Sequence, residues 1–386
     1  MAEKTPAHRE VVHLDLDTFF VSVERLKNST LNGKPVIIGG GDRGVVAACS
    51  YETRVFGVHS AMPMKLALRL CPQALVIRGD HEDYSKYSRM VTDVIASRVP
   101  LYEKASIDEF YVDMTGMEKF FGTRLFSAEL KQTIRRETGL PITYALASNK
   151  LVSKIATNEV KPNGQIEIPF GREKDYLAPL AIQKMPGVGD KTGALLKQMG
   201  IKTIRLLSEI PVEMLETIFG KFGRDLWRKA QGIDESPVIP YSEQKSIGTE
   251  NTFEADTINI RFLESELVRM TEKIAFELRQ DGRLTGCITL KLRYSDFNTL
   301  TKQAVIPYTA SDLVLLKKAK ELFHRLYDRR LRVRLLGIRF THLIPGTYQI
   351  NLFEDTQEMI SLYQQIDSIK SQFGETLLKR ASSMVK

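Results

Sequence analysis

Residues 106–113, SIDEFYVD, place two adjacent acidic residues inside an apolar, strand-forming run. In a regular strand Asp108 and Glu109 would point to opposite faces. Two carboxylates that act together must therefore lie where the alternation breaks, and the flanking LYEKASI and FYVDM predict the tip between two antiparallel strands. Like charges at close range repel, so a cation would be needed to hold both groups ionised at one place.

The segment VVHLDLD predicts a buried strand, and the apolar spacing of the following FFVSVERL predicts a helix packed on it. Asp15 and Asp17 share one face of this strand. Asp15 would meet Asp108 and Glu109 if the strand and the hairpin are neighbours in one sheet. Three carboxylates can hold two Mg²⁺ ions about 3.5–4 Å apart, the arrangement that promotes in-line phosphoryl transfer.

A lone acidic pair or a DxD motif is more often structural than a metal site. Strand-end carboxylates commonly face solvent or cap a helix, and we assign Asp17 and Asp113 to that class. Other motifs must therefore decide the role of Asp15, Asp108 and Glu109.

The composition is that of a large protein with a polyanionic partner, although a membrane surface would also fit the charge. The 386 residues, 43% of them hydrophobic, exceed the usual length of one domain, and the formal net charge is +8. The three cysteines form no CxxC pair and the six histidines have no zinc-type spacing, so neither a disulfide scaffold nor a structural zinc site is expected. The polar N-terminus and the lack of a long apolar run predict a cytoplasmic protein without a membrane span.

Strands and helices follow one another in mixed order up to about residue 165, which predicts an α+β sheet rather than strict βαβ repetition. Residues 182–232 are helical with short loops, and GIDESPVIPYSEQ is the best candidate for a linker. Beyond it the order βαββαβ describes a second α+β domain, followed by an amphipathic stretch at 355–378. The sequence therefore predicts a multidomain α+β protein.

Two motifs have the spacing to hold phosphates. SYETR places Tyr51 and Arg54 on one face of a helical turn, where they could grip a triphosphate, unless Tyr51 packs in its own domain and Arg54 is solvated. Lys150, Lys154 and Lys161 recur at helical spacing before KPNG, although such a stripe is ordinarily a solvated face. GGGDRG lacks the GK[ST] continuation of a phosphate loop and is interpreted as a turn.

Five segments occur in an order and spacing that resemble the Y-family DNA polymerases, especially those of the bacterial DNA polymerase IV type. They are HLDLDTFFVSVE, SYETRVFGV, SIDEFYVD, SNKLVSKIATNEVKPNG and PGVG. The resemblance covers roughly residues 10–345. It implies a right-hand polymerase with a palm at 1–20 and 76–165, small fingers at 21–75, a helical thumb with a helix-hairpin-helix at 166–232, a linker at 233–244, a little finger at 245–346, and a clamp-binding peptide with a helical tail at 347–386.

The resemblance also implies the metal site. Asp15, Asp108 and Glu109, with the backbone carbonyl of Leu16, would bind two Mg²⁺ ions in the palm. A primer 3′-hydroxyl would attack the α-phosphate of a dNTP, and pyrophosphate would leave.

The residues around the nucleotide follow from the same resemblance. Phe20 would be the steric gate whose ring excludes a ribose 2′-hydroxyl, with Phe19 as the core alternative. Tyr51, Arg54 and Lys161 would bind the triphosphate. The short fingers, built from small residues, imply low fidelity and tolerance of damaged templates, without indicating which lesion.

Contacts with DNA are expected in the thumb and the little finger. Gly187 and Gly189 in MPGVGDKTGALL resemble a helix-hairpin-helix whose amides bind a backbone phosphate, with an ordinary turn between helices as the alternative. In the C-terminal domain, basic residues alternate with apolar ones, which predicts a basic sheet face that contacts phosphates without reading bases, unless this face is merely solvated. These basic residues are Lys291, Arg293, Arg330, Arg332 and Arg334.

The segment QINLF resembles the short peptides with which bacterial DNA-processing proteins dock into the sliding clamp. Gln349 would satisfy polar groups at the rim of a pocket, and Leu352 with Phe353 would fill it, unless both pack on their own domain. The position departs from the family, which commonly carries this peptide at the extreme C-terminus. A helical tail of unassigned function follows here and could mask it.

The resulting hypothesis is a distributive, template-directed DNA polymerase for translesion synthesis, acting as a cytoplasmic monomer on primer-template DNA. A polymerase-shaped DNA-binding scaffold would lack a metal ligand or the triphosphate-binding residues, and neither is missing. A Mg²⁺-dependent nuclease has no need for the gate and the triphosphate residues together, so dNTP binding separates the two. No second group of carboxylates remains for a 3′→5′ exonuclease, so no proofreading is expected.

Overall fold

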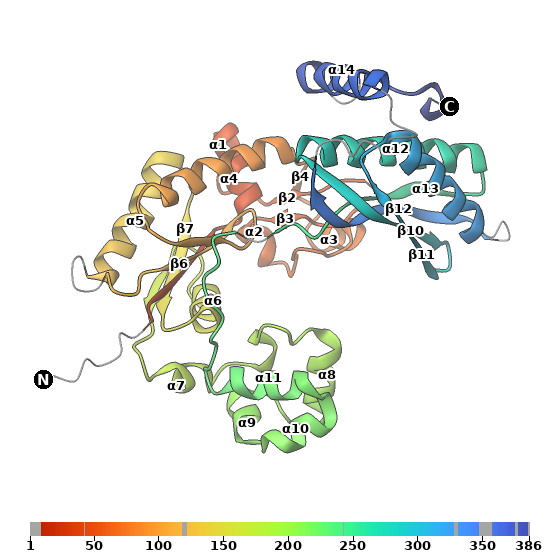
Figure 1. Ribbon diagram of the computed structural model, residues 1–386. Coiled ribbons are helices and arrows are strands. Elements are labelled where there is room, and N and C mark those ends of the chain that lie inside the picture. Colours follow the sequence, from red (N-terminus) through yellow and green to blue (C-terminus); the bar gives the residue numbers. More distant parts are fainter. Residues whose placement is uncertain are drawn as a thin grey trace, which may run out of the picture. The chain divides into compact units, whose positions relative to one another are not determined.

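The computed structural model describes residues 9–41, 43–117, 122–241, 243–327, 331–346, 357–374 and 377–384. The chain divides into two units, Met1–Ser242 and Glu243–Lys386 (Figure 1). Each unit contains a sheet with helices packed on it, which confirms the predicted multidomain α+β class. Within the described residues, no helix combines the length and the apolar character needed to cross a membrane.

The N-terminal unit is built around a five-stranded sheet of order β5-β6-β1-β7-β8. Its strands are β5 Tyr102–Lys104, β6 Glu109–Asp113, β1 Val11–Leu16, β7 Ile142–Ala147 and β8 Gln165–Glu167. Neighbours are antiparallel except β7 and β8. The central strand β1 contributes Val12, Leu14 and Leu16 to the core on one face. The alternation therefore leaves His13 and Asp15 on the opposite face.

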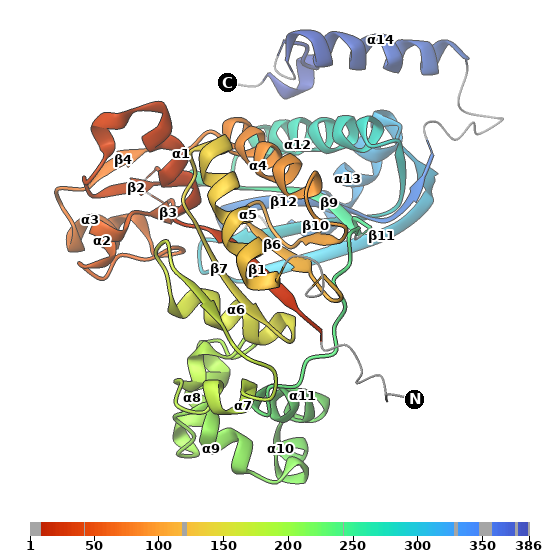
Figure 2. The same ribbon diagram turned by 90° about the vertical axis from the view of Figure 1, so that its left-hand side faces the viewer.

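Helices cover both faces of this sheet. α4 (His81–Ala96) and α5 (Thr123–Thr138) lie side by side and pack their apolar residues on the face that carries Leu14 (Figure 2). α6 (Lys150–Glu159) packs on the other face of β7, against Ala145. Asn149 starts α6, because its side chain accepts a hydrogen bond from the Val152 amide at 3.0 Å. This cap fixes the start of α6 and thereby the positions of Lys150 and Lys154 on the helix.

A small sheet of order β3-β2-β4 lies between β1 and α4 in the sequence. Its elements are α1 Phe19–Lys27, β2 Val36–Ile38, β3 Ala48–Cys49, α2 Tyr51–Arg54, α3 Met64–Leu70 and β4 Leu75–Ile77. It has its own small core, which includes the free cysteines Cys49 and Cys71. The GGGDRG segment lies between β2 and β3, where the Gly44 amide donates to the Gly41 carbonyl at 3.1 Å.

Short helices follow β8 up to residue 230. They are α7 Glu173–Leu177, α8 Asp190–Gln198, α9 Ile204–Glu209, α10 Val212–Phe219 and α11 Lys221–Ala230. Leu196, Ile204, Leu215 and Leu226 form their shared core. The boundaries expected for palm, fingers, thumb and linker stay predictions.

The C-terminal unit holds a four-stranded sheet of order β11-β10-β12-β9. Its elements follow in the predicted order βαββαβ: β9 Ser246–Thr257, α12 Ile260–Gln280, β10 Arg283–Tyr294, β11 Thr299–Thr309, α13 Asp312–Leu326 and β12 Val333–Pro345. Both helices pack on one face, because their apolar stripes share a core with Ile288 and Leu290 of β10. Lys291 and Arg293 alternate with these core residues along β10 and therefore lie on the other face of the sheet.

A further helix, α14 (Gln357–Phe373), falls inside the predicted amphipathic stretch and runs along α12 (Figures 1 and 2). Its Asp367 carboxylate lies 2.6 and 2.8 Å from the guanidinium of Arg279 on α12. The same guanidinium donates to Asp312 of α13 at 2.6 Å. The tail is therefore tied to both helices by a buried ion-pair network.

Candidate active site

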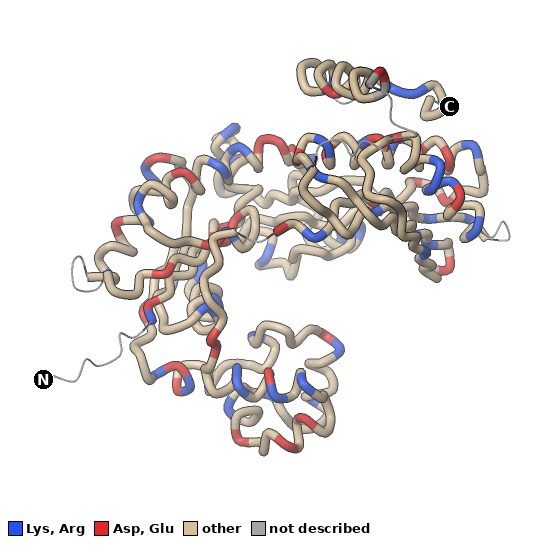
Figure 3. The backbone as a smooth tube through the Cα atoms, in the orientation of Figure 1, with Lys and Arg blue, Asp and Glu red and all other residues tan. Residues whose placement is uncertain are grey.

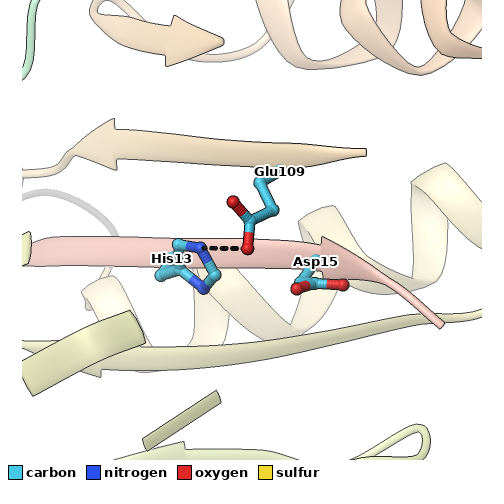
Figure 4. A group of neighbouring side chains, drawn as sticks. All are labelled: His13, Asp15 and Glu109. Atoms are coloured by element: carbon cyan, nitrogen blue, oxygen red, sulfur yellow. Dashed lines mark ion pairs between the residues drawn. The ribbon is translucent and has the colours of Figure 1, made fainter. Parts of the chain in front are cut away.

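Asp15 and Glu109 face each other across the β1–β6 pair. The register sets Asp15 directly opposite Glu109, and directly opposed side chains lie on the same face of a sheet. Asp15 is 5% exposed. Figure 4 shows both carboxylates beside the imidazole of His13. The strand and the hairpin are thus neighbours, as the sequence analysis required.

The hairpin tip separates the two acids of SIDE. The Asp108 carboxylate accepts a hydrogen bond from Ser106 Oγ at 2.6 Å, and the Asp108 carbonyl accepts one from the Leu16 amide at 3.1 Å. Its backbone therefore lies beside β1, while its carboxylate is held by Ser106. Among the described residues, the ligand atoms that lie within 4.8 Å of one another belong to His13, Asp15 and Glu109. The expected trio is only partly assembled in this form.

Two lysines pair with the carboxylates. Lys161 Nζ lies 2.5 Å from Asp15 Oδ1, and Lys154 Nζ lies 2.8 and 2.9 Å from the two oxygens of Glu109. Both ammonium groups thus occupy the space where a cation would neutralise the acids. The lysine stripe is therefore not a merely solvated face.

The electrostatics of the site favour additional positive charge. Burial raises the pKa of the Asp15 carboxyl to about 7, a rise that Lys161 opposes and that the charges of Glu109 and Asp108 increase. Burial also lowers the pKa of His13 well below its usual value. A carboxyl that is this hard to ionise is stabilised in its charged form by a divalent cation.

His13 was missed by the sequence analysis. Its ring is fully buried and packs on Tyr111 with 4.7 Å between the ring centroids. Nε2 lies 3.9 Å from Glu109 Oε1 (Figure 4). The i, i+2 spacing with Asp15 was the available signal, because it puts both side chains on one strand face.

Asp17 was assigned to the solvent-facing or helix-capping class, and this is wrong. Its side chain is buried, and Thr18, rather than Asp17, precedes α1 as the capping residue. The carboxylate accepts hydrogen bonds from Thr143 Oγ1 at 2.9 and 3.0 Å, from the Asn163 amide at 2.8 Å and from the Tyr51 hydroxyl at 3.3 Å. The buried Asp17 carboxylate thus links the end of β1 to β7, to the KPNG turn and to α2 by hydrogen bonds.

Three of the residues expected around the nucleotide lie on α1 and α2, and they are Phe20, Tyr51 and Arg54. The Phe20 ring is partly exposed and stacks on Tyr84 at 4.2 Å with an interplanar angle of 12°. Phe19 is 3% exposed and belongs to the core, which was the alternative considered for it. The Arg54 guanidinium lies over the Tyr51 ring at 4.8 Å, so these two residues share a face as predicted.

Comparison with known proteins identifies the family. The model of the impB/mucB/samB family matches residues 14–158, and that of its C-terminal domain matches residues 244–352. A DNA polymerase IV of Dehalococcoides mccartyi is 40% identical over 371 residues, which cover 95% of each chain. The chain belongs to the Y family of DNA polymerases.

Further relatives support the same assignment. A DNA polymerase IV of Streptococcus agalactiae is 37% identical over 342 residues, 87% of this chain and 94% of the relative. The solved structure of a Y-family DNA polymerase chimera matches with a TM-score of 0.78 at 27% identity, covering 87% of this chain and 100% of the chimera. This Y-family member is therefore a DNA-directed DNA polymerase with the right-hand fold, and its chemistry depends on a divalent metal.

The thumb of this Y-family polymerase contains the expected glycine turn. The model of the DNA polymerase-iota thumb domain matches residues 183–234. Gly187 has a φ of +97°, a conformation that favours glycine, and Gly189 precedes the first turn of α8. The Val188 amide donates to the Met185 carbonyl at 3.0 Å. Phosphate binding at this turn stays a prediction.

The basic residues expected on the little-finger sheet have mixed surroundings. Lys291 pairs with both oxygens of Glu250 at 2.8 Å, and Arg293 donates to Thr299 Oγ1 at 2.8 Å. The Arg334 guanidinium lies over the Phe297 ring at 4.7 Å. In Figure 3, basic and acidic residues are interspersed along this unit.

The expected alternation of basic and apolar residues does not extend to Arg332. β12 begins at Val333 and pairs there with Tyr294, so the exposed Arg332 precedes the strand instead of alternating within it. Arg330 lies outside the described residues. Sequence reasoning missed Arg339, which is exposed and shares the open face with Lys291 by the β10–β12 register.

The proposed clamp peptide is not part of the described structure. Gln349, Leu352 and Phe353 all lie outside the described residues. Their role in this Y-family polymerase stays a prediction from the sequence.

Proposed function

We propose that this DNA polymerase carries out low-fidelity, distributive translesion synthesis, extending a primer 3′-hydroxyl by phosphoryl transfer at the β1–β6 site without proofreading. The observation that carries the proposal is the pairing of Asp15 with Glu109 on adjacent strands, each already neutralised by a lysine. Acids and ammonium groups at such short range are what a site for phosphates and metal ions requires.

The donor set fits Mg²⁺. Asp15, Asp108 and Glu109 provide hard carboxylate oxygens, and the carbonyl of Leu16 adds a further oxygen beside Asp15. Bound Mg²⁺, two ions per site, would stabilise the attacking and the leaving oxygen of the transfer. Release of the Asp108 carboxylate from Ser106 would let this third acid join the other two.

Lys161 and Lys154 would change partners during substrate binding. In this form each neutralises one acid, which limits the repulsion between Asp15 and Glu109. Once a metal ion neutralises that acid, the lysine can pair with a phosphate oxygen instead. Lys161 would then act with Tyr51 and Arg54 on the triphosphate.

Phe20 would select the sugar. Its stacking on the buried ring of Tyr84 restricts its rotation, so a rigid aromatic edge stands at the start of α1. A rigid ring in contact with the sugar leaves no room for a 2′-hydroxyl. Low fidelity would follow from the small size of the sheet β3-β2-β4 and its helices, which offer little surface to test the shape of a base pair.

DNA would be held without base readout. The amides near Gly187 and Gly189 would bind a backbone phosphate at the start of α8. Lys291, Arg293 and Arg339 would meet phosphates on the open face of the β10–β12 sheet. Contacts of this kind weaken steeply with salt and release the duplex readily, which favours distributive synthesis.

Binding of the QINLF segment to the sliding clamp would increase the processivity of the polymerase. Replacement of Gln349, Leu352 and Phe353 by Ala should abolish stimulation by the clamp and leave basal extension intact. Equal loss of both activities would mean that the segment is structural.

Primer extension tests the function directly. We would compare the wild type with Asp15→Asn, Asp108→Asn and the control Asp113→Asn on a labelled primer-template with Mg²⁺ and dNTPs. Asp113 lies on β6 like Glu109, but in the described part of the chain its carboxylate accepts only a local hydrogen bond, from the Thr115 amide at 3.0 Å. We expect the wild type and the Asp113→Asn control to extend the primer, and Asp15→Asn and Asp108→Asn to fail. DNA binding without extension by any of them would favour a non-catalytic scaffold.

A further inference from the structure

His13 has an unmet bonding capacity inside the active site. Its side chain is 0% exposed, and neither Nδ1 nor Nε2 has a hydrogen-bond partner among the described residues. Buried ring nitrogens without a partner are rare, and each such group calls for an explanation. A cation bound by a ring nitrogen, in either orientation of the imidazole, would explain why these nitrogens have no other partner.

The geometry directs this imidazole toward the carboxylates. His13 and Asp15 lie two residues apart on one face of β1, and Glu109 is opposite Asp15 on β6. Nε2 lies 3.9 Å from Glu109 Oε1, and one ligand atom from each of the three residues lies within 4.8 Å of the others (Figure 4). Nitrogen and oxygen ligands bind a first-row ion at about 2.0–2.2 Å, so small side-chain rotations close the site.

We propose that His13, Asp15 and Glu109 form a binding site for a divalent transition-metal ion of the Zn²⁺ class, which overlaps the Mg²⁺ site and inhibits the polymerase. This rests on the proposed function, because the two carboxylates are the same. Imidazole is a good ligand for Zn²⁺, whereas Mg²⁺ prefers oxygen ligands and retains its water. His13 therefore gives Zn²⁺ an advantage that Mg²⁺ cannot share.

The lysines set the conditions for binding. Either ion must displace Lys154 from Glu109 and Lys161 from Asp15, since both ammonium groups are within 3 Å of the acids. The loss of these ion pairs weakens both metals alike. The nitrogen ligand then decides the selectivity, and Zn²⁺ bound there would keep Mg²⁺ and the primer end from the carboxylates.

Binding of Zn²⁺ to the full-length protein tests the proposal without DNA, dNTP or Mg²⁺. Affinities would be measured by competition with a chromophoric chelator for the wild type, His13→Gln and the control His59→Gln. His59 is exposed and lies outside the cluster. We expect His13→Gln to lower the affinity at least about tenfold and His59→Gln to leave it unchanged. Equal affinities of all three proteins, with unchanged circular dichroism, would overturn the proposal.

A second measurement needs no variant. The X-ray absorption spectrum of the Zn²⁺-loaded wild type should show one imidazole nitrogen among oxygen ligands, and an all-oxygen shell would overturn the proposal. Added Mg²⁺ should raise the apparent dissociation constant for Zn²⁺, since the sites overlap, and no effect of Mg²⁺ would contradict this overlap. Failure of extension with Mg²⁺ alone would instead refute the proposed function, so the two ideas fail separately.

Discussion

The carboxylate of Asp17 accepts a hydrogen bond from the backbone amide of Asn163 at 2.8 Å, which joins the end of β1 to the turn after α6. That turn carries Lys161, whose ammonium lies 2.5 Å from Asp15. Gly164 completes the turn, because a Cβ there would lie 1.9 Å from the Val160 carbonyl oxygen. Asp17 therefore positions Lys161 beside Asp15 without belonging to the proposed set of metal ligands.

Asp17→Ala should weaken nucleotide binding. It leaves the Asn163 amide and the Thr143 hydroxyl without their acceptor, at a cost of about 1–3 kcal/mol in the free energy of unfolding. It also frees the KPNG turn, so the KM for dNTP should rise more than kcat falls. Single-nucleotide incorporation kinetics and thermal unfolding measure the two effects. Lower stability with an unchanged KM would reduce Asp17 to a purely structural residue.

Phe20→Ala should relax sugar selection. Removal of the ring opens space beneath the sugar, so the ratio of rNTP to dNTP incorporation should rise by about 10²-fold or more, while dNTP use is largely retained. Phe19→Ala is the matched control, since Phe19 is a core residue. It should destabilise the protein by about 3–5 kcal/mol and leave the ratio unchanged. Equal ratios for wild type and Phe20→Ala would remove Phe20 from the gate.

Asp15→Asn should stabilise the metal-free protein, and more so at high pH. The folded pKa of about 7 exceeds the usual 3.8, so the contribution of Asp15 to stability is present below about pH 4 and is lost as the pH rises through 7. The amide avoids this loss. The gain in unfolding free energy at pH 8 should reach at most about 4 kcal/mol, reduced by the lost pair with Lys161, and should shrink at pH 5.

Denaturant unfolding with a chelator at both pH values checks this expectation. Mg²⁺ should then stabilise the wild type at pH 8 more than the variant, because the ion binds the ionised carboxylate. The same gain at pH 5 and pH 8 would show that ionisation of Asp15 is not its cause.

Much of the site was readable from local sequence. The apolar patterns of VVHLDLD and SIDEFYVD predict a buried strand and a hairpin, and the structure makes them neighbours with Asp15 opposite Glu109. The spacing in SYETR likewise predicts the shared face of Tyr51 and Arg54. These features depend only on the periods of strands and helices, which neighbouring residues fix.

The features of the site that were not predicted depend on contacts between segments far apart in the sequence. Asp17 meets Thr143 and Asn163, which are 126 and 146 residues away, so no local pattern could give its partners. Lys154 likewise finds Glu109 only because α6 packs on the face of β1. The clearest local clue left unused was His13, whose spacing from Asp15 placed it in the site.

Asp367→Asn should detach the C-terminal tail. Arg279 is buried between Asp367 of α14 and Asp312 of α13, and loss of one acid leaves its guanidinium with half its neutralising charge. Breaking a buried ion pair from one side costs about 3–5 kcal/mol, so α14 should dissociate from α12 and become sensitive to protease, while the sheet β11-β10-β12-β9 remains folded. Limited proteolysis with mass spectrometry measures this, with the exposed Glu358→Gln on α14 as the control. Wild-type resistance of the Asp367→Asn tail would show that the apolar contacts of α14 suffice to hold it.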